Sequence, residues 1–401
     1  MDAPISNEDG QRQKKRKVSF KRIFAILLVL AAIGLVISEA TGTTQVLADL
    51  LNPPMHFVGA AYVTHEVGAA AQIHAADDGF FLATRDAMRF HNTDGAEVFR
   101  YGHVMGNPAL FGRGNYAAIV EHGGRTFSVF NSQQRLYQIA TDWPITRLAL
   151  SPQGFVAVMM QTDRGIHRIE IFDRDGTMFY EGDHADRNIL PILMDINHDA
   201  SVLAIAYIDI NDAEMNSFIS FVSIDGSHVG ADDIFAENRD NPGQIIGSMQ
   251  FLADGSLAVV SDTRIFVLNS AATTVWQAEL NNRVTHVAFA DSWFAVAYGD
   301  IMLNRVGMPP GTVVAHNALG ATQLFAHTLP GGVVRHMQMG GGHLVIGSGD
   351  GHFTALAGNG QAQWELTLHS NISDIGIMGN VNNVVSLTPT QTNVLHRVRE
   401  N

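Results

Sequence analysis

The 401-residue sequence contains no cysteine, and all of its lysines lie within the first 21 residues. Without thiols the chain cannot form a disulfide framework, a zinc-thiolate site, an iron–sulfur cluster or a cysteine nucleophile. Beyond Lys21 the only permanently charged cation is arginine, which excludes a Schiff-base lysine, a lysine general base and a phosphate-binding lysine. Charged residues make up only 16% of the chain and apolar residues 46%, which is enough to bury a large core.

The charged residues are unevenly distributed. The formal net charge is −14, yet residues 1–22 hold seven basic and three acidic side chains. The other 379 residues therefore hold 18 basic and 36 acidic side chains. Nucleic-acid binding requires clustered cations that neutralise phosphates. The acidic part of the chain thus excludes nucleic acid as a partner.

One apolar segment follows the basic tail. Residues 23–37 contain no polar side chain. As a helix they would span roughly 22 Å, and flanking residues extend this toward the hydrocarbon core of about 30 Å. The sequence therefore predicts a basic cytoplasmic tail at 1–22, a transmembrane signal-anchor helix at 23–38 and a juxtamembrane linker at 39–54.

The alternative for this segment is a cleaved signal peptide. Ser38, Glu39 and Ala40 fit a small-x-small cleavage site. Both interpretations keep the basic flank in the cytoplasm and export the acidic part. We expect a single-pass protein of the cell membrane, with a cytoplasmic N-terminus and an extracytoplasmic domain.

From residue 55 onward, short β-rich runs alternate with turns of Gly, Asn and Asp. The runs recur as a unit of four strands, clearest from Met249 to Trp276. The first strand of each unit is expected near Gln72, Pro108, Arg147, Leu193, Ser248, His286, His336 and Asp374. This spacing predicts an all-β fold at 55–401, an eight-bladed β-propeller. Seven blades are the alternative, because insertions at 189–240 and 283–332 obscure the count.

The eighth unit lacks a fourth strand, whereas residues 56–64 precede the first unit and belong to none. An open ring would leave two unpaired sheet edges. We therefore expect this N-terminal strand to complete the last blade and close the ring.

Four turns between third and fourth strands place an aromatic residue four positions after a small one. The pairs are Gly95 and Phe99, Gly176 and Tyr180, Ala272 and Trp276, and Gly360 and Trp364. Other units have Leu136, Gly230 or Leu324 at the aromatic position. The pattern resembles the blade signature of quinoprotein-like propellers, which implies that the rings dock between neighbouring blades. The Gly-His and Trp-Asp dipeptides of the related WD-repeat blades are absent as a set.

The whole layout of basic tail, single helix and cysteine-free propeller resembles an uncharacterised family of membrane-anchored Firmicutes propellers. That family has no known function. The resemblance implies a fold and a location but no activity.

The candidate site residues lie at the start of the first strands, which line the channel of a propeller. Consecutive blades bring His286, His336 and Asp374 side by side, with Arg147 across the ring. Two imidazoles and a carboxylate can bind a ligand, hold a divalent metal or act as acid and base. The alternative is that these groups only satisfy water and loop backbone at a polar channel mouth.

Two further sets of carboxylates occur in the sequence. Asp209, Asp212 and Glu214 form an acidic insertion with closely spaced oxygens, a weak calcium candidate without the glycine and spacing of a calcium loop. A second set recurs just after the second strands: Asp86, Asp163, Asp262, Asp300 and Asp350. Aspartate in a hairpin turn bonds its own backbone, so this recurrence requires no ligand. We expect no bound cofactor.

The sequence favours a binding or scaffold module: a membrane-tethered propeller that presents itself to an envelope protein or a cell-wall polymer. No specific catalytic motif is present. The alternative is a hydrolase or lyase that acts at the channel mouth through His286, His336 and Asp374. A quinone-dependent dehydrogenase is disfavoured, because vicinal cysteines and the cofactor-stacking tryptophans are not found.

Overall fold

The computed structural model describes residues 55–399 except 67, 69, 185, 187, 212–214, 226–232, 242, 303–304, 318–322, 330–331 and 370. The tail, transmembrane helix and linker expected at 1–22, 23–38 and 39–54 lie outside the described residues. Within the described part, no helix is long and apolar enough to span a membrane. Its β-rich region forms one unit, Phe57–Arg397.

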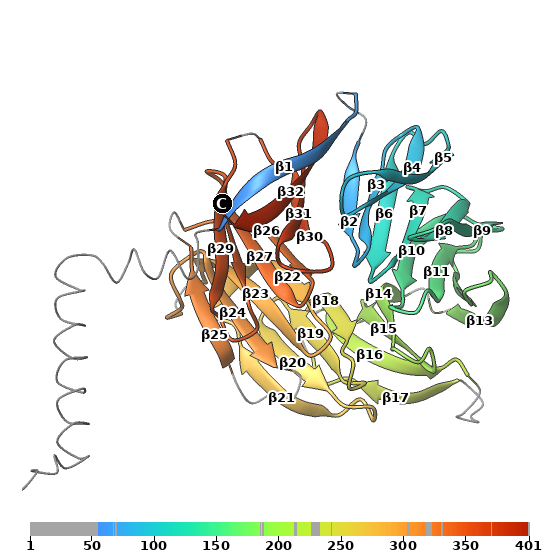
Figure 1. The fold of residues 1–401 in the computed structure, drawn as a ribbon. Coiled ribbons are helices and arrows are strands. Elements are labelled where there is room, and N and C mark those ends of the chain that lie inside the picture. The colour runs from blue at the N-terminus through green and yellow to red at the C-terminus, as the bar shows by residue number, and fades with distance from the viewer. Residues whose placement is uncertain are drawn as a thin grey trace, which may run out of the picture. The chain divides into compact units, whose positions relative to one another are not determined.

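Eight four-stranded sheets follow one another along this unit (Figure 1). We number them blades 1 to 8. Blades 1 and 2 contain β2 (Gln72–Ala75), β3 (Gly79–Ala83), β4 (Ala87–Asn92), β5 (Glu97–Gly102), β6 (Pro108–Arg113), β7 (Tyr116–Glu121), β8 (Thr126–Asn131) and β9 (Arg135–Ala140). Blades 3 and 4 contain β10 (Ile145–Leu150), β11 (Val156–Gln161), β12 (His167–Phe172), β13 (Met178–His184), β14 (Ile189–Ile196), β15 (Val202–Asp209), β16 (Asn216–Ser223) and β17 (Ile234–Asn238).

The second half of the ring repeats the arrangement. Blades 5 and 6 contain β18 (Ile246–Phe251), β19 (Leu257–Ser261), β20 (Arg264–Leu268), β21 (Thr274–Glu279), β22 (Asn282–Phe289), β23 (Trp293–Ile301), β24 (Thr312–Asn317) and β25 (Gln323–Thr328). Blade 7 contains β26 (Val334–Gly340), β27 (His343–Ser348), β28 (His352–Leu356) and β29 (Ala362–Thr367). Blade 8 contains β30 (Asp374–Ile377), β31 (Asn383–Leu387), β32 (Gln391–Arg399) and β1 (Met55–Thr64). The blade count is eight, and the seven-bladed alternative is wrong.

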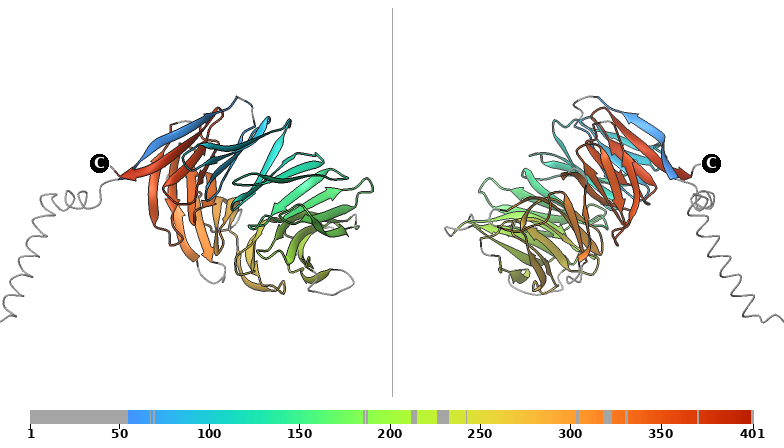
Figure 2. Two further views of the ribbon diagram at one scale, coloured as in Figure 1. Left: turned by 45° about the vertical axis from the view of Figure 1, so that its right-hand side comes forward. Right: turned by 90° about the vertical axis from the view of Figure 1, so that its left-hand side faces the viewer.

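The ring closes as the sequence predicts. In blade 8 the strand order is β1-β32-β31-β30, so the N-terminal strand supplies the missing fourth strand. Figure 2 shows β1 lying along the edge of this blade. Where β1 ends, His65 N donates a hydrogen bond of 3.0 Å to Thr390 O. The first and last strands of the ring are thus joined in one sheet.

The burial of each strand follows its place in the blade. Inner strands such as β3 and β19 are buried throughout, because neighbouring blades cover both of their faces. The fourth strand β21 instead alternates between half-buried and exposed residues, and its sequence alternates accordingly. Periodicity therefore identifies the outer strands, and continuous apolar runs identify the inner ones.

The core is divided among the blade interfaces. Eight hydrophobic clusters occur in the described residues, one between each pair of neighbouring blades. The cluster between blades 8 and 1 combines Phe80 and Leu82 with Val385 and Leu387. Since every blade buries apolar side chains against two others, loss of one interface weakens the whole ring.

Aromatic residues near the start of the fourth strands dock between blades, as the resemblance implies. Trp364 of blade 7 packs on Phe57 of blade 8 at 5.2 Å between ring centroids, and its Nε1 donates to Val381 O at 2.6 Å. In blade 2 the docked ring is Tyr137, directly after the expected position Leu136. Gly176 lies against this ring, where a Cβ would approach it to 2.8 Å. Its φ of 81° also favours glycine.

In blade 6 the docked ring is Phe325, directly after the expected Leu324, and it packs against Gly360 of the next blade. In blades 1, 2 and 6 alike, the ring is the third residue of the fourth strand and follows a β-bulge in that strand. The turn before it is one residue shorter in blade 2 and one residue longer in blade 6 than in blade 1. The aromatic signature is therefore more complete than its fixed four-residue spacing indicates. Gly230 lies outside the described residues.

Candidate functional site

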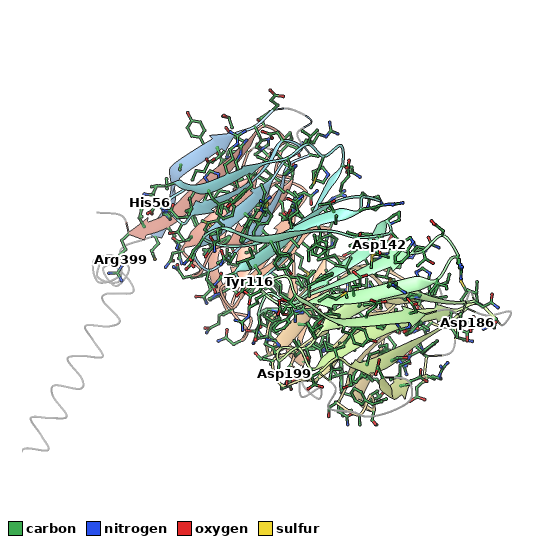
Figure 3. The ribbon with its side chains drawn as sticks, turned by 90° about the vertical axis from the view of Figure 1, so that its right-hand side faces the viewer. His56, Tyr116, Asp142, Asp186, Asp199 and Arg399 are labelled. Atoms are coloured by element: carbon green, nitrogen blue, oxygen red, sulfur yellow. The ribbon has the colours of Figure 1, made fainter. Side chains whose placement is uncertain are left out.

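The first strands of the blades surround a central channel. β2 contacts β6 on one side and β30 on the other, and β26 lies between β22 and β30. We call the end at which these strands begin the strand-start mouth. The end formed by the turns between first and second strands is the turn mouth. Figure 3 labels residues of both ends: Tyr116 begins β7 directly after such a turn and Asp199 lies in one, whereas Asp142 and Asp186 lie in connections between blades.

The predicted channel residues occupy equivalent register positions in their blades: His286 pairs with Ala297, His336 with Gly347, and Asp374 with Leu387. Only Asp374 begins its strand, whereas His336 is the third residue of β26 and His286 the fifth of β22. A β-bulge immediately precedes Arg147, Leu193, Ser248, His286 and His336. Because a bulge re-aims the following side chain, it sets the direction of the candidate residues.

His286 and His336 lie close enough to interact electrostatically. Burial lowers the pKa of His336, and the neighbouring charge of His286 lowers it further. Burial likewise lowers the pKa of His286, and hydrogen bonding to the Arg335 backbone partly offsets this. The Nδ1 atom of His286 is buried and has no hydrogen-bond partner among the described residues. Both imidazoles are therefore predominantly neutral at pH 7.

Asp374 and Arg147 do not join this pair. Burial raises the pKa of Asp374 to about 6, and neither His286 nor His336 contributes to that change. The Asp374 carboxylate accepts a hydrogen bond of 2.8 Å from the amide of the next residue, Ile375. The side chain of Arg147 is exposed. The structure thus couples the two histidines but leaves the carboxylate and the guanidinium out of that coupling.

Of the three metal candidates, only Asp209 lies in the described residues. Asp209 ends β15, where its carboxylate accepts hydrogen bonds from Asn211 N (3.0 Å) and Nδ2 (2.8 Å). Asp212 and Glu214 lie outside the described residues. Elsewhere in the described chain, no three His, Asp or Glu side chains are grouped to hold a metal ion.

Three of the aspartates after the second strands accept hydrogen bonds at the ends of those strands, two of them from side chains and one from the backbone of the connection before the blade. Asp86 accepts a hydrogen bond of 2.6 Å from Thr84 Oγ1, and Ser348 Oγ donates to Asp350. Asp262 accepts a bond of 3.0 Å from Ile245 N. These carboxylates hold the chain at the ends of second strands.

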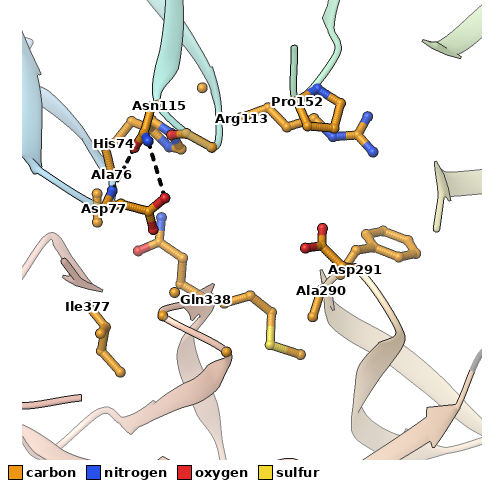
Figure 4. Close-up of a pocket in the computed structure, with 18 of the residues that line it drawn as sticks. His74, Ala76, Asp77, Arg113, Asn115, Pro152, Ala290, Asp291, Gln338 and Ile377 are labelled. Carbon is orange, nitrogen blue, oxygen red and sulfur yellow. Dashed lines mark hydrogen bonds between the residues drawn. The ribbon is translucent and has the colours of Figure 1, made fainter. Parts of the chain in front are cut away.

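A cavity opens toward the other end of the channel, and its lining begins at the residues directly after His286 and His336. It is a bowl of about 1100 Å³ at the turn mouth (Figure 4). Four stretches supply most of its lining: 74–77, 112–116, 287–293 and 337–342. All four are ends of first strands with the turns that follow them. We call this cavity the turn-mouth bowl.

A buried ion pair crosses the channel beside this bowl. Arg113 ends β6 of blade 2, and its Nη1 lies 2.6 Å from Asp195 Oδ1 in β14 of blade 4. Its Nη2 donates to Phe251 O of blade 5 at 2.9 Å, and Phe251 N donates to Asp195 Oδ2 at 2.7 Å. Both side chains are nearly buried, at 13% and 9% exposed. Three blades that are distant in sequence are thereby joined.

Burial raises the pKa of Asp195 to about 6, although Arg113 and the Phe251 amide oppose this change. Desolvation of the Asp195 carboxylate therefore outweighs the stabilisation that Arg113 and the Phe251 amide give to its ionised form. No sequence motif marks this pair, because its members are 82 residues apart and Arg113 and Phe251 are 138 apart.

The blade 1 side of the bowl is held by a small polar network. Asn115 Oδ1 accepts from Asp77 N at 2.8 Å, and Asn115 Nδ2 donates to Asp77 Oδ2 at 3.2 Å. His74 lies behind them, with its Nε2 2.9 Å from Gly114 O. Burial lowers the pKa of His74. Gly112 leaves room for this imidazole, since a Cβ there would lie 2.0 Å from its ring.

The comparisons with solved structures show the same fold. BamB from Moraxella catarrhalis matches 85% of this chain and 98% of its own, with a TM-score of 0.51 and 13% identity. The computationally designed protein Ika8 matches 83% and 97%, with a TM-score of 0.58 and 15% identity. Saccharomyces cerevisiae Sqt1 matches 85% and 98%, with a TM-score of 0.57 and 11% identity. At these identities the likeness concerns the β-propeller fold alone.

The sequence comparisons are more restricted. No curated protein sequence matches the chain. One protein family matches residues 59–396, nearly the whole ring, and its description is "Family of unknown function (DUF5711)". The chain therefore belongs to the family of unknown function DUF5711.

Proposed function

We propose that this protein is a membrane-tethered, extracytoplasmic binding module, which recognises an envelope protein or a cell-wall polymer through the turn-mouth bowl. The observation that carries the proposal is the bowl itself: a cavity of about 1100 Å³ to which all eight blades contribute lining residues. Concave sites that collect polar groups from several elements are the usual location of ligand binding. The Asp77–Asn115 network orients two such groups at its wall.

The tether and the location rest on the sequence. The apolar run at 23–37 follows a basic segment, which favours a cytoplasmic N-terminus and an exported ring. Protease added to intact protoplasts should then degrade the ring and leave the tail and the helix. Complete protection of residues 55–399 would contradict the proposed location.

Site-specific photo-crosslinking in the native cell tests the proposed recognition surface. A crosslinking amino acid is placed at Gln133, an exposed residue of the bowl rim, in the full-length protein. The matched control places it at Asp142, an exposed residue in the connection between blades 2 and 3. We expect a discrete crosslinked product from Gln133 that Asp142 does not give. Digestion with a peptidoglycan hydrolase then distinguishes a wall polymer, whose product disappears, from a protein.

The proposal fails if Gln133 gives no product, or if both positions give the same products. In the first case nothing approaches the bowl. In the second the contacts reflect crowding in the envelope and not recognition by one face.

A hydrolase or lyase reaction at the strand-start mouth is the second candidate. It is favoured by Asp374, whose pKa of about 6 suits a general acid or base near neutral pH. His286 and His336 lie at the same mouth, and His286 has an unpartnered Nδ1. If the protein has a hydrolase or lyase activity and both Asp374→Asn and His336→Ala leave it unchanged, these residues are not its catalytic acid and base.

A further inference from the structure

We propose that the turn-mouth bowl binds a basic peptide segment of a partner protein, whose lysine or arginine side chains interact with Asp77 and Asp291. This inference rests on the proposed binding function and specifies its ligand. It follows from the charges in the bowl, from the use of its aromatic rings and from its aliphatic surface.

The first observation is the balance of charge in the lining. The ionisable acids and bases among the lining residues are Asp77, Asp291, Arg113, His74 and His198. Figure 4 shows the carboxylates of Asp77 and Asp291 directed into the bowl from opposite sides. Asp291 is 83% exposed, and its Oδ1 lies 3.7 Å from His198 Nε2. Asn115 engages one oxygen of Asp77, and a carboxylate has roughly four acceptor sites.

Neither Arg113 nor His74 is a free cation of the lining. Both terminal nitrogens of Arg113 are engaged, with Asp195 and with Phe251 O. Burial lowers the pKa of His74, so its imidazole is neutral at pH 7. The bowl therefore offers accessible negative charge without an equal number of free cations. An anionic polymer would be repelled, whereas an ammonium or guanidinium group would be attracted.

The second observation concerns the aromatic residues of the lining, because carbohydrate sites commonly present a free aromatic face. Tyr116 packs against Gly154 of the next blade, where a Cβ would approach the ring to 2.6 Å. Phe289 packs on Phe294 with ring centroids 6.0 Å apart. Trp293 is only 7% exposed. These rings are used in packing, which disfavours a sugar ring as the bound group.

The third observation is the aliphatic surface between the two carboxylates. Met337 and Met339 of blade 7 line the bowl, with Ile377 and Ala290 on either side. Met337, Met339 and Ala290 also pack on the hydrophobic cluster between blades 6 and 7, and the two methionines are half-buried, so part of each faces the bowl. Long basic side chains lay their methylene stems on such surfaces while the charged end reaches a polar partner. Methionine adapts its shape to varied side chains. The lining therefore suits lysine and arginine side chains better than compact cations.

The test uses full-length protein in detergent micelles and fluorescence anisotropy of labelled, capped five-residue peptides. One peptide contains two lysines among glycines, and matched peptides contain two glutamines or two glutamates. A labelled glucosamine tetramer carries amino groups on a sugar instead. We expect the lysine peptide to bind at least about tenfold more tightly than the glutamine peptide, equivalent to about 1.4 kcal/mol. The difference should shrink as salt is raised.

The variant Asp77→Asn with Asp291→Asn should lower affinity for the lysine peptide by about tenfold. The control Asp142→Asn removes an equally exposed carboxylate in a connection between blades and should change nothing. Since both bowl residues are exposed, the double variant should keep its melting temperature. The comparison of lysine and glutamine peptides on the unaltered protein does not depend on any variant.

Three results would overturn the inference: no binding of the lysine peptide, equal binding of the glutamine peptide, or unchanged affinity in the double variant. Binding of the glucosamine tetramer alone would assign the bowl to amino sugars and also overturn it. If Gln133 crosslinks to a partner but the lysine peptide does not bind, the basic-peptide inference fails and the proposed function remains.

Discussion

Replacing Asp374 by asparagine should stabilise the ring at neutral pH. The Asp374 carboxyl is held in a largely buried place without an opposing charge, and its pKa is raised from 3.8 to about 6. A change of that size corresponds to roughly 3 kcal/mol of folding free energy lost when the carboxylate is ionised. Asparagine keeps an oxygen for the hydrogen bond from Ile375 N, which is 2.8 Å long, and removes the charge.

The pH dependence gives the sharper test. Because the folded pKa is above the unfolded one, the folded state holds this proton more tightly. The stability from that proton is fully present below pH 3.8 and is lost as pH rises through about 6. The gain from Asp374→Asn should therefore approach about 3 kcal/mol at pH 8 and disappear toward pH 4.

Urea denaturation of the full-length protein, followed by tryptophan fluorescence, measures this difference. All four tryptophans lie in the ring and none in residues 1–54, so the signal reports unfolding of the ring. The control Asp142→Asn, at an exposed position, should stay within about 0.5 kcal/mol at every pH. The reasoning is refuted if Asp374→Asn is no more stable than the unaltered protein at pH 8, or if its gain is the same at pH 4.5.

Three further predictions concern the ring and the bowl. Deleting residues 55–66 removes the closing strand and should cost several kcal/mol, on the order of a disulfide; an unchanged melting temperature would contradict closure. Gly112→Ala should destabilise the propeller by about 1–3 kcal/mol in the same denaturation assay, because the new methyl group meets the imidazole of His74. Equal stability would show that this imidazole moves aside without cost. Arg113→Ala leaves Asp195 buried without its cation and should cost about 3–5 kcal/mol at pH 8. That cost should fall toward pH 5, where Asp195 takes up a proton, and a cost independent of pH would refute the role assigned to the carboxylate.

The sequence predicts the blades well, because blade structure is local. The eight expected first-strand positions fall in eight first strands, since each blade is a set of consecutive hairpins with its own turns. The closing strand was also predictable. The eighth unit lacks a fourth strand, residues 56–64 belong to no unit, and pairing the two removes an unpaired sheet edge. The aromatic signature was missed by one residue at Tyr137 and Phe325, because the turns before these two fourth strands differ in length by one residue from the turn of blade 1.

The candidate site was less predictable, because it depends on contacts between distant blades. The sequence pattern selected the strand-start mouth, where it placed His286, His336 and Asp374 together. The structure couples only the two histidines. Arg113 and Asp195 are ordinary residues of two first strands, and only the curvature of the ring brings them within 2.6 Å. The one feature of the sequence that could have indicated this ion pair was Arg113, a charged residue at the end of a strand expected to line the channel.

The closing strand imposes an order on synthesis. β1 is the first strand of the ring to be made, and its partner β32 is the last. The strand contains no acidic residue, lysine, arginine or proline, and such segments aggregate readily while unpaired. A ribosome adds about 5–20 residues per second, so β1 waits tens of seconds for β32. A chain that lacks β32 would leave β1 without its partner in blade 8, so β1 stays uncovered until this nine-residue strand has been made and paired.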